Sequence, residues 1–311
     1  MVQFRVPSDG VPSNREPSDA DVEDGLGAEL ERVAVDVATR AARFVRAAVP
    51  RLAVARRDGG VAVGSKSTAT DLVTDVDRAS EALLVEALGR LRPGDAVLGE
   101  EGGQHPAGTS ADGSVVERSG IQWVVDPIDG TVNFVLGIPY FSVSVAARRG
   151  AFVLAGCVVD VLRGEVFSAR AGGGSFVRSA TGAPRRLVGP RPVDLSEAVV
   201  GTGFGYDREV RRRQGAIMAA LLTSVGNVRR MGSAALDLCY VAAGRLDAYY
   251  EAGLNDWDRA AGLLIVTEAG AAAATLAADG VLPETTLAAG ATVLPDLTAL
   301  VAGLVTDTAT A

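Results

Sequence analysis

The sequence predicts a mixed fold in which an α+β half is followed by an α/β half. Three observations lead to this prediction. Amphipathic helical patterns occupy the first part of the chain, β-type runs separated by glycine-containing turns fill the middle, and helices alternate with strands from about residue 186 onward. At 311 residues, of which 48% are apolar, the chain is long enough to bury a full core in one large domain or two ordinary ones.

Two helices are predicted before the first strand. Apolar residues recur at helical spacing from Leu30, with charges between them, so an amphipathic helix is expected to end near Pro50. A second helix is expected to begin around Thr74, a favourable N-cap, with Asp77 in its first turn, and to stop at "RPGD" just after Leu91.

The middle of the chain favours an antiparallel sheet. "AVLGEEGG" is predicted to form a short strand that ends in Glu100, residues 102–120 a loop, and "IQWVVD" the next strand. The runs "YFSVSVAAR", "FVLAGCVVDV", "GEVFSAR" and "GSFVR" continue the sheet. The later alternation predicts strands at 197–204, 227–232, 246–251, 271–276 and 288–294, and helices at 208–225, 233–244, 257–269 and 295–304.

These patterns divide the chain into a leader (1–26), an α+β part (27–185) and an α/β part (186–311). The leader is rich in Pro, Ser and Asp and lacks an apolar h-region, so we expect a disordered segment and not a signal peptide. No run reaches the roughly 18 apolar residues that a membrane span needs. Cys157 and Cys239 stand in apolar contexts and are expected to be buried thiols in a reducing cytoplasm.

Composition argues against several classes of function. The net charge of −8 is unfavourable for binding nucleic acid or acidic membranes. His105 is the one histidine, and it is expected to be exposed in a loop. The chain therefore lacks the residues of a Ser–His–Asp or Cys–His hydrolase and of a zinc site rich in thiols or imidazoles. Acid–base and metal chemistry would therefore fall to carboxylates. Lys66 is the single lysine among thirty basic residues, which fits either a functional ammonium or a chance surface residue.

Five acids stand just past strand ends or in the first turns of helices, each flanked by apolar sequence. They are Asp77, Glu100, Asp126, Asp129 and Asp258. Two carboxylates about 4 Å apart repel by roughly 4 kcal/mol at an effective dielectric of about 20. A convergence of these acids therefore requires protonation or bound cations. Hard oxygen ligands select Mg²⁺, Mn²⁺ or Ca²⁺.

The segment "DPIDGT" suits a site that holds both a metal and an anion. Pro127 restrains the backbone after the strand, so the two aspartates can face one site with the Ile128 carbonyl between them. Gly130 permits a close backbone approach, and Thr131 is expected to start a helix whose free N–H groups bind phosphate. A metal between carboxylates and a phosphate is the arrangement of metal-assisted phosphoryl transfer.

In order and spacing, "LGEEG", "WVVDPIDGTVNF" and "GLNDWDRAAGLLIVTEAGA" resemble the signature segments of the inositol monophosphatase family of Mg²⁺-dependent, lithium-sensitive phosphatases. "DLVTDVD" and "GSAALDLCYVAAGRLDAYYE" are similar as well, and the resemblance covers about residues 30–305. It implies a layered αβαβα sandwich of the inositol monophosphatase and fructose-1,6-bisphosphatase type, and a homodimer. The forms "DPIDGTVNF" and "DAYYEAGLNDWD" resemble the bacterial inositol-1-monophosphatases within the family.

The resemblance also implies the metal ligands. Glu100, Asp126 and the Ile128 carbonyl would hold a first metal ion. Asp126, Asp129 and Asp258 would hold a second. The implied metal is Mg²⁺, and most of its ligands come from the part at 27–185.

The same resemblance implies the catalytic groups. Thr131, hydrogen-bonded to Asp77, would orient and deprotonate the attacking water. The N–H groups of Gly130 and Thr131 would bind the phosphate. A third, weaker metal ion would lie near Glu100 and Asp77, and Lys66 falls where the family has its lysine beside the metal site.

For the substrate, the resemblance implies hydroxyl contacts from Asp129, Glu251 and the backbone at Ala234. Asp258 is also expected to contact the substrate. Two positions depart from the family pattern, because Leu136 stands where a histidine is frequent and Asp256 where an uncharged residue is usual. Either departure bears on substrate preference.

We therefore expect Mg²⁺-dependent hydrolysis of myo-inositol 1-phosphate, by a phosphoric monoester hydrolase that takes a small phosphorylated polyol. The same chemistry on histidinol phosphate, fructose 1,6-bisphosphate or adenosine 3′,5′-bisphosphate stays open. For the last of these, residues 211–213, three consecutive arginines, are candidates to hold a second phosphate. A non-catalytic protein that retains the fold is the competing class, and no nucleic-acid or membrane partner is expected.

Overall fold

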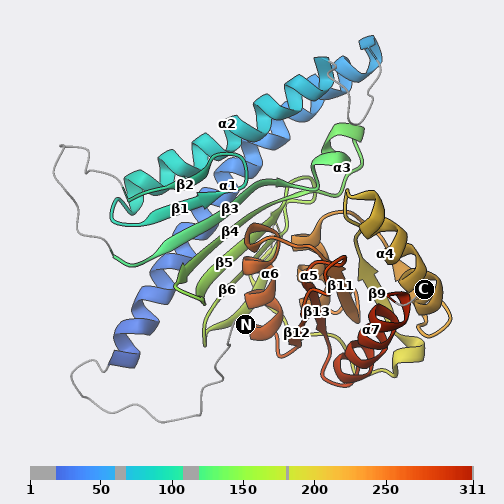
Figure 1. Ribbon diagram of the computed structural model, residues 1–311. Helices are drawn as coiled ribbons and strands as arrows, with labels where there is room; N and C mark the ends of the chain where they lie inside the picture. The colour runs from blue at the N-terminus through green and yellow to red at the C-terminus, as the bar shows by residue number, and fades with distance from the viewer. Residues whose placement is uncertain (1–18, 60–67, 108–118, 180–181, 310–311) are drawn as a thin grey trace.

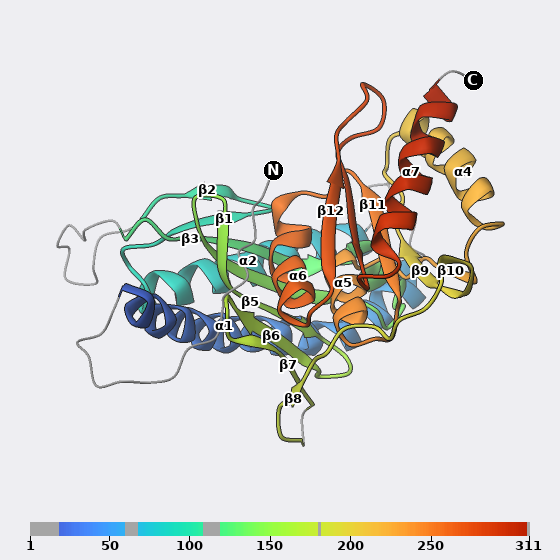
Figure 2. The ribbon, with the colours of Figure 1, turned by 90° about the horizontal axis from the view of Figure 1, so that it is seen from below.

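The computed structural model describes residues 19–59, 68–107, 119–179 and 182–309, and it confirms the layered αβαβα sandwich (Figure 1). Two helices cover one face of a large sheet, two further helices lie between this sheet and a smaller one, and a last pair covers the outer face of the smaller sheet (Figure 2). The three helical layers consist of α1 (Asp19–Gly59) and α2 (Thr68–Leu91), α5 (Ala234–Ala242) and α6 (Asp256–Glu268), and α4 (Arg208–Leu221) and α7 (Leu294–Ala309).

Helix α1 extends past both of its predicted ends. Residues 19–26, assigned above to the leader, form its first turns. Residues 1–18 lie outside the described residues. Pro50 removes a backbone hydrogen bond, yet α1 continues to Gly59 because Leu52 is buried and extends the apolar stripe beyond it. Tertiary packing thus outweighs the local break.

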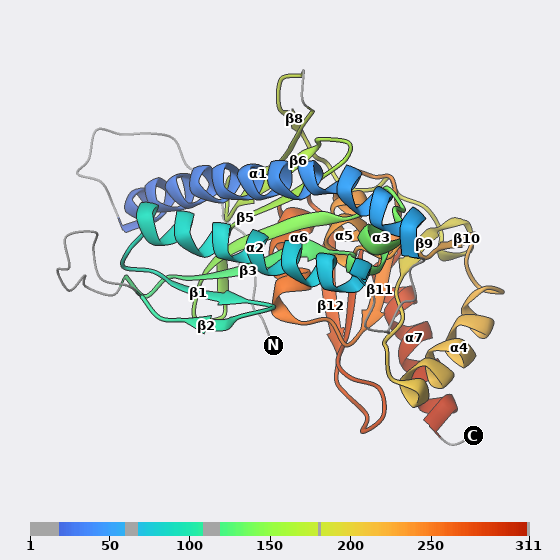
Figure 3. The same cartoon turned by 90° about the horizontal axis from the view of Figure 1, so that it is seen from above.

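Helix α2 begins at Thr68, so the prediction of an N-cap at Thr74 is wrong, and Asp77 lies well inside the helix. Side by side with α1 (Figure 3), α2 buries Leu84 and Leu88 against the same core. The extra turns place Asp77 on the buried side of the helix, where it is 3% exposed. Residues 60–67, which include Lys66, lie outside the described residues.

The large sheet has eight strands in the order β2-β1-β3-β4-β5-β6-β7-β8. Strands β1 and β3 are parallel and every other neighbouring pair is antiparallel. The strands are β1 (Ala96–Gly99), β2 (Gly103–His105), β3 (Gln122–Asp129), β4 (Ser142–Arg149), β5 (Phe152–Asp160), β6 (Val166–Arg170), β7 (Gly174–Arg178) and β8 (Arg185–Arg186).

Two details of this sheet differ from prediction. β2 occupies part of the expected loop 102–120, of which residues 108–118 lie outside the described residues. His105 therefore ends a strand, and its Nε2 lies 3.7 Å from Oε1 of the buried Glu81. Strand β3 continues through Pro127 to Asp129, but its register with β4 shifts between Asp126 and Asp129. This bulge turns both carboxylates out of the regular ladder.

The smaller sheet has five strands in the order β10-β9-β11-β13-β12. Its strands are β9 (Val199–Thr202), which follows the short 3₁₀ helix η1 (Leu195–Glu197), β10 (Asn227–Arg229), β11 (Ala248–Ala252), β12 (Ala272–Leu276) and β13 (Thr285–Ala289). The predicted strand 288–294 is thus shifted toward the N-terminus. The boundary between 27–185 and 186–311 falls inside β8, the last strand of the large sheet, and α5 and α6 of the second part pack on that sheet. A division into two domains remains a prediction.

The central layer holds the two sheets together. Leu236, Leu238 and Ile265 of α5 and α6 are fully buried with Phe167 from the large sheet and Tyr249 from the small one. Cys157 and Cys239 are buried free thiols, as predicted. None of the described helices is long and apolar enough to cross a membrane.

Helix α6 approaches strand β5 so closely that one position admits glycine only. A Cβ on Gly156 would lie 2.9 Å from Cα of Ala261 and 3.1 Å from its Cβ. The neighbour there is helix backbone and cannot rotate away.

We predict that Gly156→Ala lowers the free energy of unfolding by about 1–3 kcal/mol, because it forces α6 away from the sheet. Urea denaturation measures this. The control is Gly303→Ala in α7, where a Cβ meets nothing within 4 Å, and it should stabilise by about 0.5–1 kcal/mol. Equal stability of the two variants would contradict the close packing of α6.

Candidate active site

Three buried or half-buried carboxylates converge at one end of the large sheet. Ligand oxygens of Asp126, Asp129 and Asp258 all lie within 4.8 Å of one another. Asp126 and Asp129 flank the bulge in β3, and Asp258 stands in the first turn of α6. Across Pro127, Oδ1 of Asp126 accepts a hydrogen bond from the Ile128 N–H at 3.0 Å, which closes the tight turn that the sequence predicted.

Asp129 is held by four hydrogen bonds from the N-terminus of α5 and from strand β4. Its carboxylate accepts from the hydroxyls of Ser233 (2.5 Å) and Ser142 (3.2 Å) and from the N–H groups of Ala234 (3.3 Å) and Ala235 (2.9 Å). Burial raises the pKa of Asp129, and these four bonds offset part of that rise. The bonds fix the direction in which the carboxylate points.

Asp258 is fixed by its own helix start. Its Oδ2 accepts from the N–H of Asn255, the N-cap of α6, at 2.6 Å. Asp256, two residues earlier, points elsewhere and pairs with Arg148 of β4 at 2.5 Å. The acid at this unusual position therefore ties α6 to the large sheet and does not line the cavity described below.

Glu100 reaches the cluster from the loop after β1, and Glu81 of α2 holds that loop. The Glu81 carboxylate accepts from the N–H groups of Glu101 (2.9 Å) and Gly102 (2.6 Å). A Cβ on Gly99 would lie 2.3 Å from the same carboxylate. Sequence reasoning missed Glu81, since its spacing in α2 resembles that of any amphipathic helix.

The acids raise one another's pKa values. Burial, with the neighbouring Glu101, raises the pKa of Glu100 to about 7, and burial, with Asp129, raises that of Asp258 to about 7. The pKa of Asp126 lies well above its ordinary range because of burial and the adjacent Glu100. Within the described ranges no Lys, Arg or His forms an ion pair with Asp126, Asp129, Asp258 or Glu100.

Such a cluster fits a divalent cation. Its donors are carboxylate oxygens without thiol or imidazole, which is the ligand set of Mg²⁺, Mn²⁺ and Ca²⁺. A bound cation would relieve the repulsion that raises the pKa values. Among the predicted metal ligands, Asp126, Asp129 and Asp258 are brought together as one group, and Glu100 borders the same cavity.

Helix α3 (Thr131–Leu136) begins at Thr131, as predicted, and Gly130 before it has φ = 94°. This left-handed backbone favours glycine, and a Cβ there would lie 3.0 Å from the Gly232 carbonyl. The Thr131 hydroxyl donates to the Ile128 carbonyl at 3.0 Å, in place of the hydrogen bond to Asp77 that the resemblance implied. Both Gly130 and Thr131 line the cavity.

Asn133 connects this loop to the start of α5. Its Nδ2 donates to the carbonyls of Tyr140 and Met231, each at 2.7 Å. Sequence reasoning missed this residue too, because a single asparagine in "TVNF" gives no sign of partners so far along the chain. The bridge keeps Gly130 and Gly232 packed together.

A cavity of about 230 Å³ opens beside the carboxylates. Glu251 and Ala234, predicted to contact substrate, line it, although the Ala234 N–H is bonded to Asp129. The hydroxyl of Tyr249 donates to Glu251, and burial raises the Glu251 pKa to about 7. Asp77 and Leu136 do not line the cavity, and Lys66 lies outside the described residues.

The rim of the cavity contains groups that sequence reasoning did not select. Phe204, Tyr206 and Arg230 line it, from the loops after β9 and β10. None of residues 211–213, the candidates for holding a second phosphate, lines the cavity. Arg213 is 3% exposed and pairs with Asp279 at 2.7 Å.

Comparisons with known proteins agree with this geometry. A sequence model of the inositol monophosphatase family matches residues 27–308. An inositol-1-monophosphatase of Mycobacterium leprae is 50% identical over 247 residues, which are 78% of this chain and 82% of that protein. The Nus factor SuhB of Pasteurella multocida is 41% identical over 237 residues, 76% of this chain and 82% of that protein. The solved structure of Mycobacterium tuberculosis SuhB has a TM-score of 0.73 and 41% identity, and the match covers 89% of this chain and 97% of that one.

We predict that Glu81→Gln weakens divalent-cation binding by about 10–100-fold, because the amide replaces a carboxylate that two backbone N–H groups need. Thermal stabilisation titrated with the cation measures the change. Glu86→Gln, an exposed position on the same helix, should leave binding unaltered. If Glu81→Gln bound the cation as tightly as the parent protein, the loop would not depend on Glu81.

Proposed function

This chain belongs to the inositol monophosphatase family, and from that premise we propose that it is a Mg²⁺-dependent phosphatase that hydrolyses myo-inositol 1-phosphate to inositol and phosphate. The observation that carries the proposal is the convergence of Asp126, Asp129 and Asp258 at the start of α3. The carboxylates on one side would bind a cation, and the free backbone N–H groups on the other would bind a phosphate in contact with that cation.

The proposed metal ligands are Glu100, Asp126, Asp129, Asp258 and the carbonyl of Ile128. Bound Mg²⁺ supplies charge neutralisation for the phosphate and a water of lowered pKa. The four hydrogen bonds on Asp129 and the Asn255 N–H on Asp258 hold these carboxylates in place before any ion binds. Such preorganisation lowers the entropy cost of assembling the ligand set.

The phosphate would accept hydrogen bonds from the N–H groups of Gly130 and Thr131. The proposed base for the attacking water is Asp77, acting through the Thr131 hydroxyl. Burial, together with Glu101, Glu100 and Glu81, raises the pKa of Asp77 to about 8, so its carboxylate has the basicity to take a proton near neutral pH. The Thr131 hydroxyl would have to turn from the Ile128 carbonyl to join this path. Lys66 completes the proposed catalytic set.

The alcohol part of the substrate would lie toward Glu251. Its carboxylate accepts from Tyr249 with one oxygen and lines the cavity beside Ala234. Carboxylates of this kind bind polyol hydroxyls, which donate to them. Histidinol phosphate offers a cationic group to the same carboxylate and remains an alternative substrate.

A second candidate is a bisphosphorylated substrate, and Arg230 favours it. Arg230 is the one basic residue among the described residues that line the cavity, and no hydrogen bond or ion pair occupies its guanidinium in the described part of the chain. Its Nη1 lies 2.8 Å from where a Cβ on Gly232 would stand, next to the loop of Gly130. An exposed guanidinium at the rim suits a second phosphate, as in fructose 1,6-bisphosphate or adenosine 3′,5′-bisphosphate.

Four further expectations accompany the proposal. By family likeness we expect a lithium-sensitive homodimer in the cytoplasm, which light scattering and inhibition assays test. The acidic balance predicts no binding of nucleic acid, and this remains a prediction because one relative carries the name Nus factor. Salt-dependent RNA binding would contradict it.

We predict that Asp126→Asn lowers Mg²⁺-dependent release of phosphate from inositol 1-phosphate by at least about a hundredfold, because it removes a shared ligand. The assay compares the four candidate phosphates with and without Mg²⁺. Asp296→Asn, an exposed acid in α7, should retain full activity. Full activity of Asp126→Asn would contradict the proposed metal ligands. If inositol 1-phosphate were the poorest substrate of the four phosphates, the substrate assignment would be wrong.

We also predict that Arg230→Gln raises the KM for bisphosphorylated substrates by about tenfold, since it removes a charge-assisted hydrogen bond to the second phosphate. The KM for inositol 1-phosphate should stay within about threefold. Arg229→Gln provides the matched control, because Arg229 is exposed, bonds to Asn227 and does not line the cavity. An equal loss for mono- and bisphosphates would contradict a second phosphate site.

A further inference from the structure

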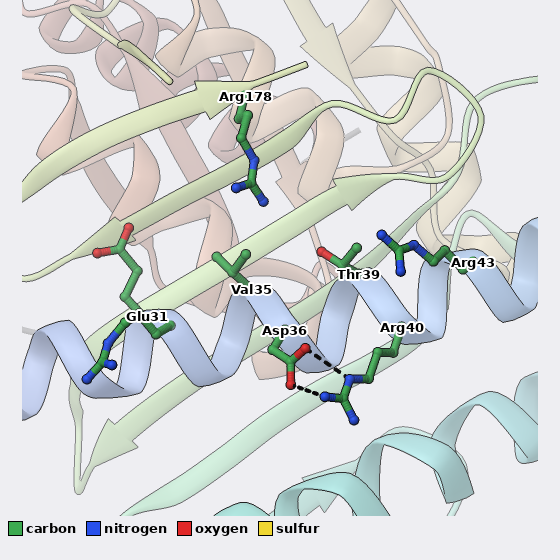
Figure 4. A pocket seen from close by; sticks show the side chains of 8 residues that line it. Glu31, Val35, Asp36, Thr39, Arg40, Arg43 and Arg178 are labelled. Carbon is green, nitrogen blue, oxygen red and sulfur yellow. Dashed lines mark hydrogen bonds and ion pairs between the residues drawn. The ribbon is translucent and has the colours of Figure 1, made fainter. Parts of the chain in front are cut away.

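A second polar site lies on the opposite side of the large sheet, between α1 and strand β7. Two adjoining hollows of about 680 and 460 Å³ share Thr39, Arg43 and Arg178 as lining residues (Figure 4). Arg178 points from β7 toward α1, and Thr39 faces it from the helix. Neither hollow shares a lining residue with the carboxylate cavity.

The acids in these hollows are already paired. Glu31 accepts from the Ser168 hydroxyl at 2.8 Å and lies 3.7 Å from Arg170. Asp36 pairs with Arg40 at 2.7 Å. Asp160 completes the set of acids and pairs with the Arg163 guanidinium at 3.0 Å. Neighbouring arginines therefore neutralise the negative charge of these acids.

Three arginines of the hollows have no such partner. Within the described ranges, Arg43, Arg46 and Arg178 take part in no ion pair or hydrogen bond. The hydroxyl of Thr39 lies between Arg43 and Arg178 in Figure 4, and it is buried without a hydrogen-bond partner. A buried hydroxyl left unpaired costs about 1–3 kcal/mol, so this position is poised for an acceptor.

We propose that this groove binds the phosphate group of a small phosphorylated molecule. Its oxygens would accept from the guanidinium groups of Arg43 and Arg178 and from the hydroxyl of Thr39. Planar guanidinium forks match a tetrahedral oxyanion in two N–H bonds each, and a third donor from the side completes the cradle. The remaining hollow is large enough for the organic part of an ester, beside Arg46.

The experiment is calorimetric titration of the full-length protein with inorganic phosphate and with inositol 1-phosphate. It is done in EDTA and at constant ionic strength, so that the carboxylate site lacks its cation. The test variant is Arg43→Gln/Arg178→Gln. The control is Arg90→Gln/Arg211→Gln, which removes the same charge from exposed helix positions outside the groove.

The groove variant should raise the Kd for both ligands by at least about tenfold, and the control should bind as the parent protein does. Tighter binding of the ester would identify it as the ligand, and equal binding would assign the site to free phosphate. Equal weakening in the two double variants would overturn the proposal, because charge alone would explain it. Single-stranded RNA that binds more tightly than either phosphate would also overturn it, in favour of nucleic acid.

Thr39→Val separates a binding role from a structural one. If the Thr39 hydroxyl binds the ligand, the variant keeps or raises the melting temperature of the free protein but binds phosphate more weakly. If the hydroxyl supports the fold, the melting temperature falls and phosphate binding is unchanged, which would contradict the proposal.

Discussion

The repulsion among carboxylates gathered at one end of the large sheet is the constraint on which the rest of the site depends. Asp126 and Asp129 are buried, Asp258 is half-buried and the exposed Glu100 lies beside them; none has a basic partner among the described residues, and the raised pKa values of the four express the cost. The fold tolerates this because backbone N–H groups and hydroxyls from α5, α6 and β4 hold two of the carboxylates. A bound cation would offset the remainder. The family membership and the geometry of the acids thus agree on a metal-dependent phosphatase.

The sequence predicted the parts of the site that follow from local chemistry. Asp126 and Asp129 were found because both acids stand at the end of an apolar strand, with a proline between them and a glycine after them. A purely structural strand end seldom has this combination of residues. Glu81 and Asn133 were missed because their partners are backbone groups that only the tertiary fold brings near. The ends of α1 were misplaced for the same reason, since buried Leu52 outweighs the effect of Pro50.

The carboxylates and the rim of the cavity come from different layers of the molecule. The carboxylates belong to the large sheet and the central helices, whereas the rim of the cavity comes from loops of the small sheet, with Tyr206 and Arg230. Loops of this kind change without disturbing the core. One fold can therefore keep the same metal-binding carboxylates while the residues at the rim of the cavity differ from enzyme to enzyme.

The position of Asp258 has a consequence for biosynthesis. Strand β3 is synthesised before α5, and α6 follows only after β9, β10 and β11 of the small sheet. Asp126 and Asp129 are therefore made before Ser233 and Ala235, whose donors hold Asp129, and before Asp258, the third carboxylate of the group. The group of three carboxylates is complete only when α6 docks on β5, so any stability that a bound cation adds is gained late in folding.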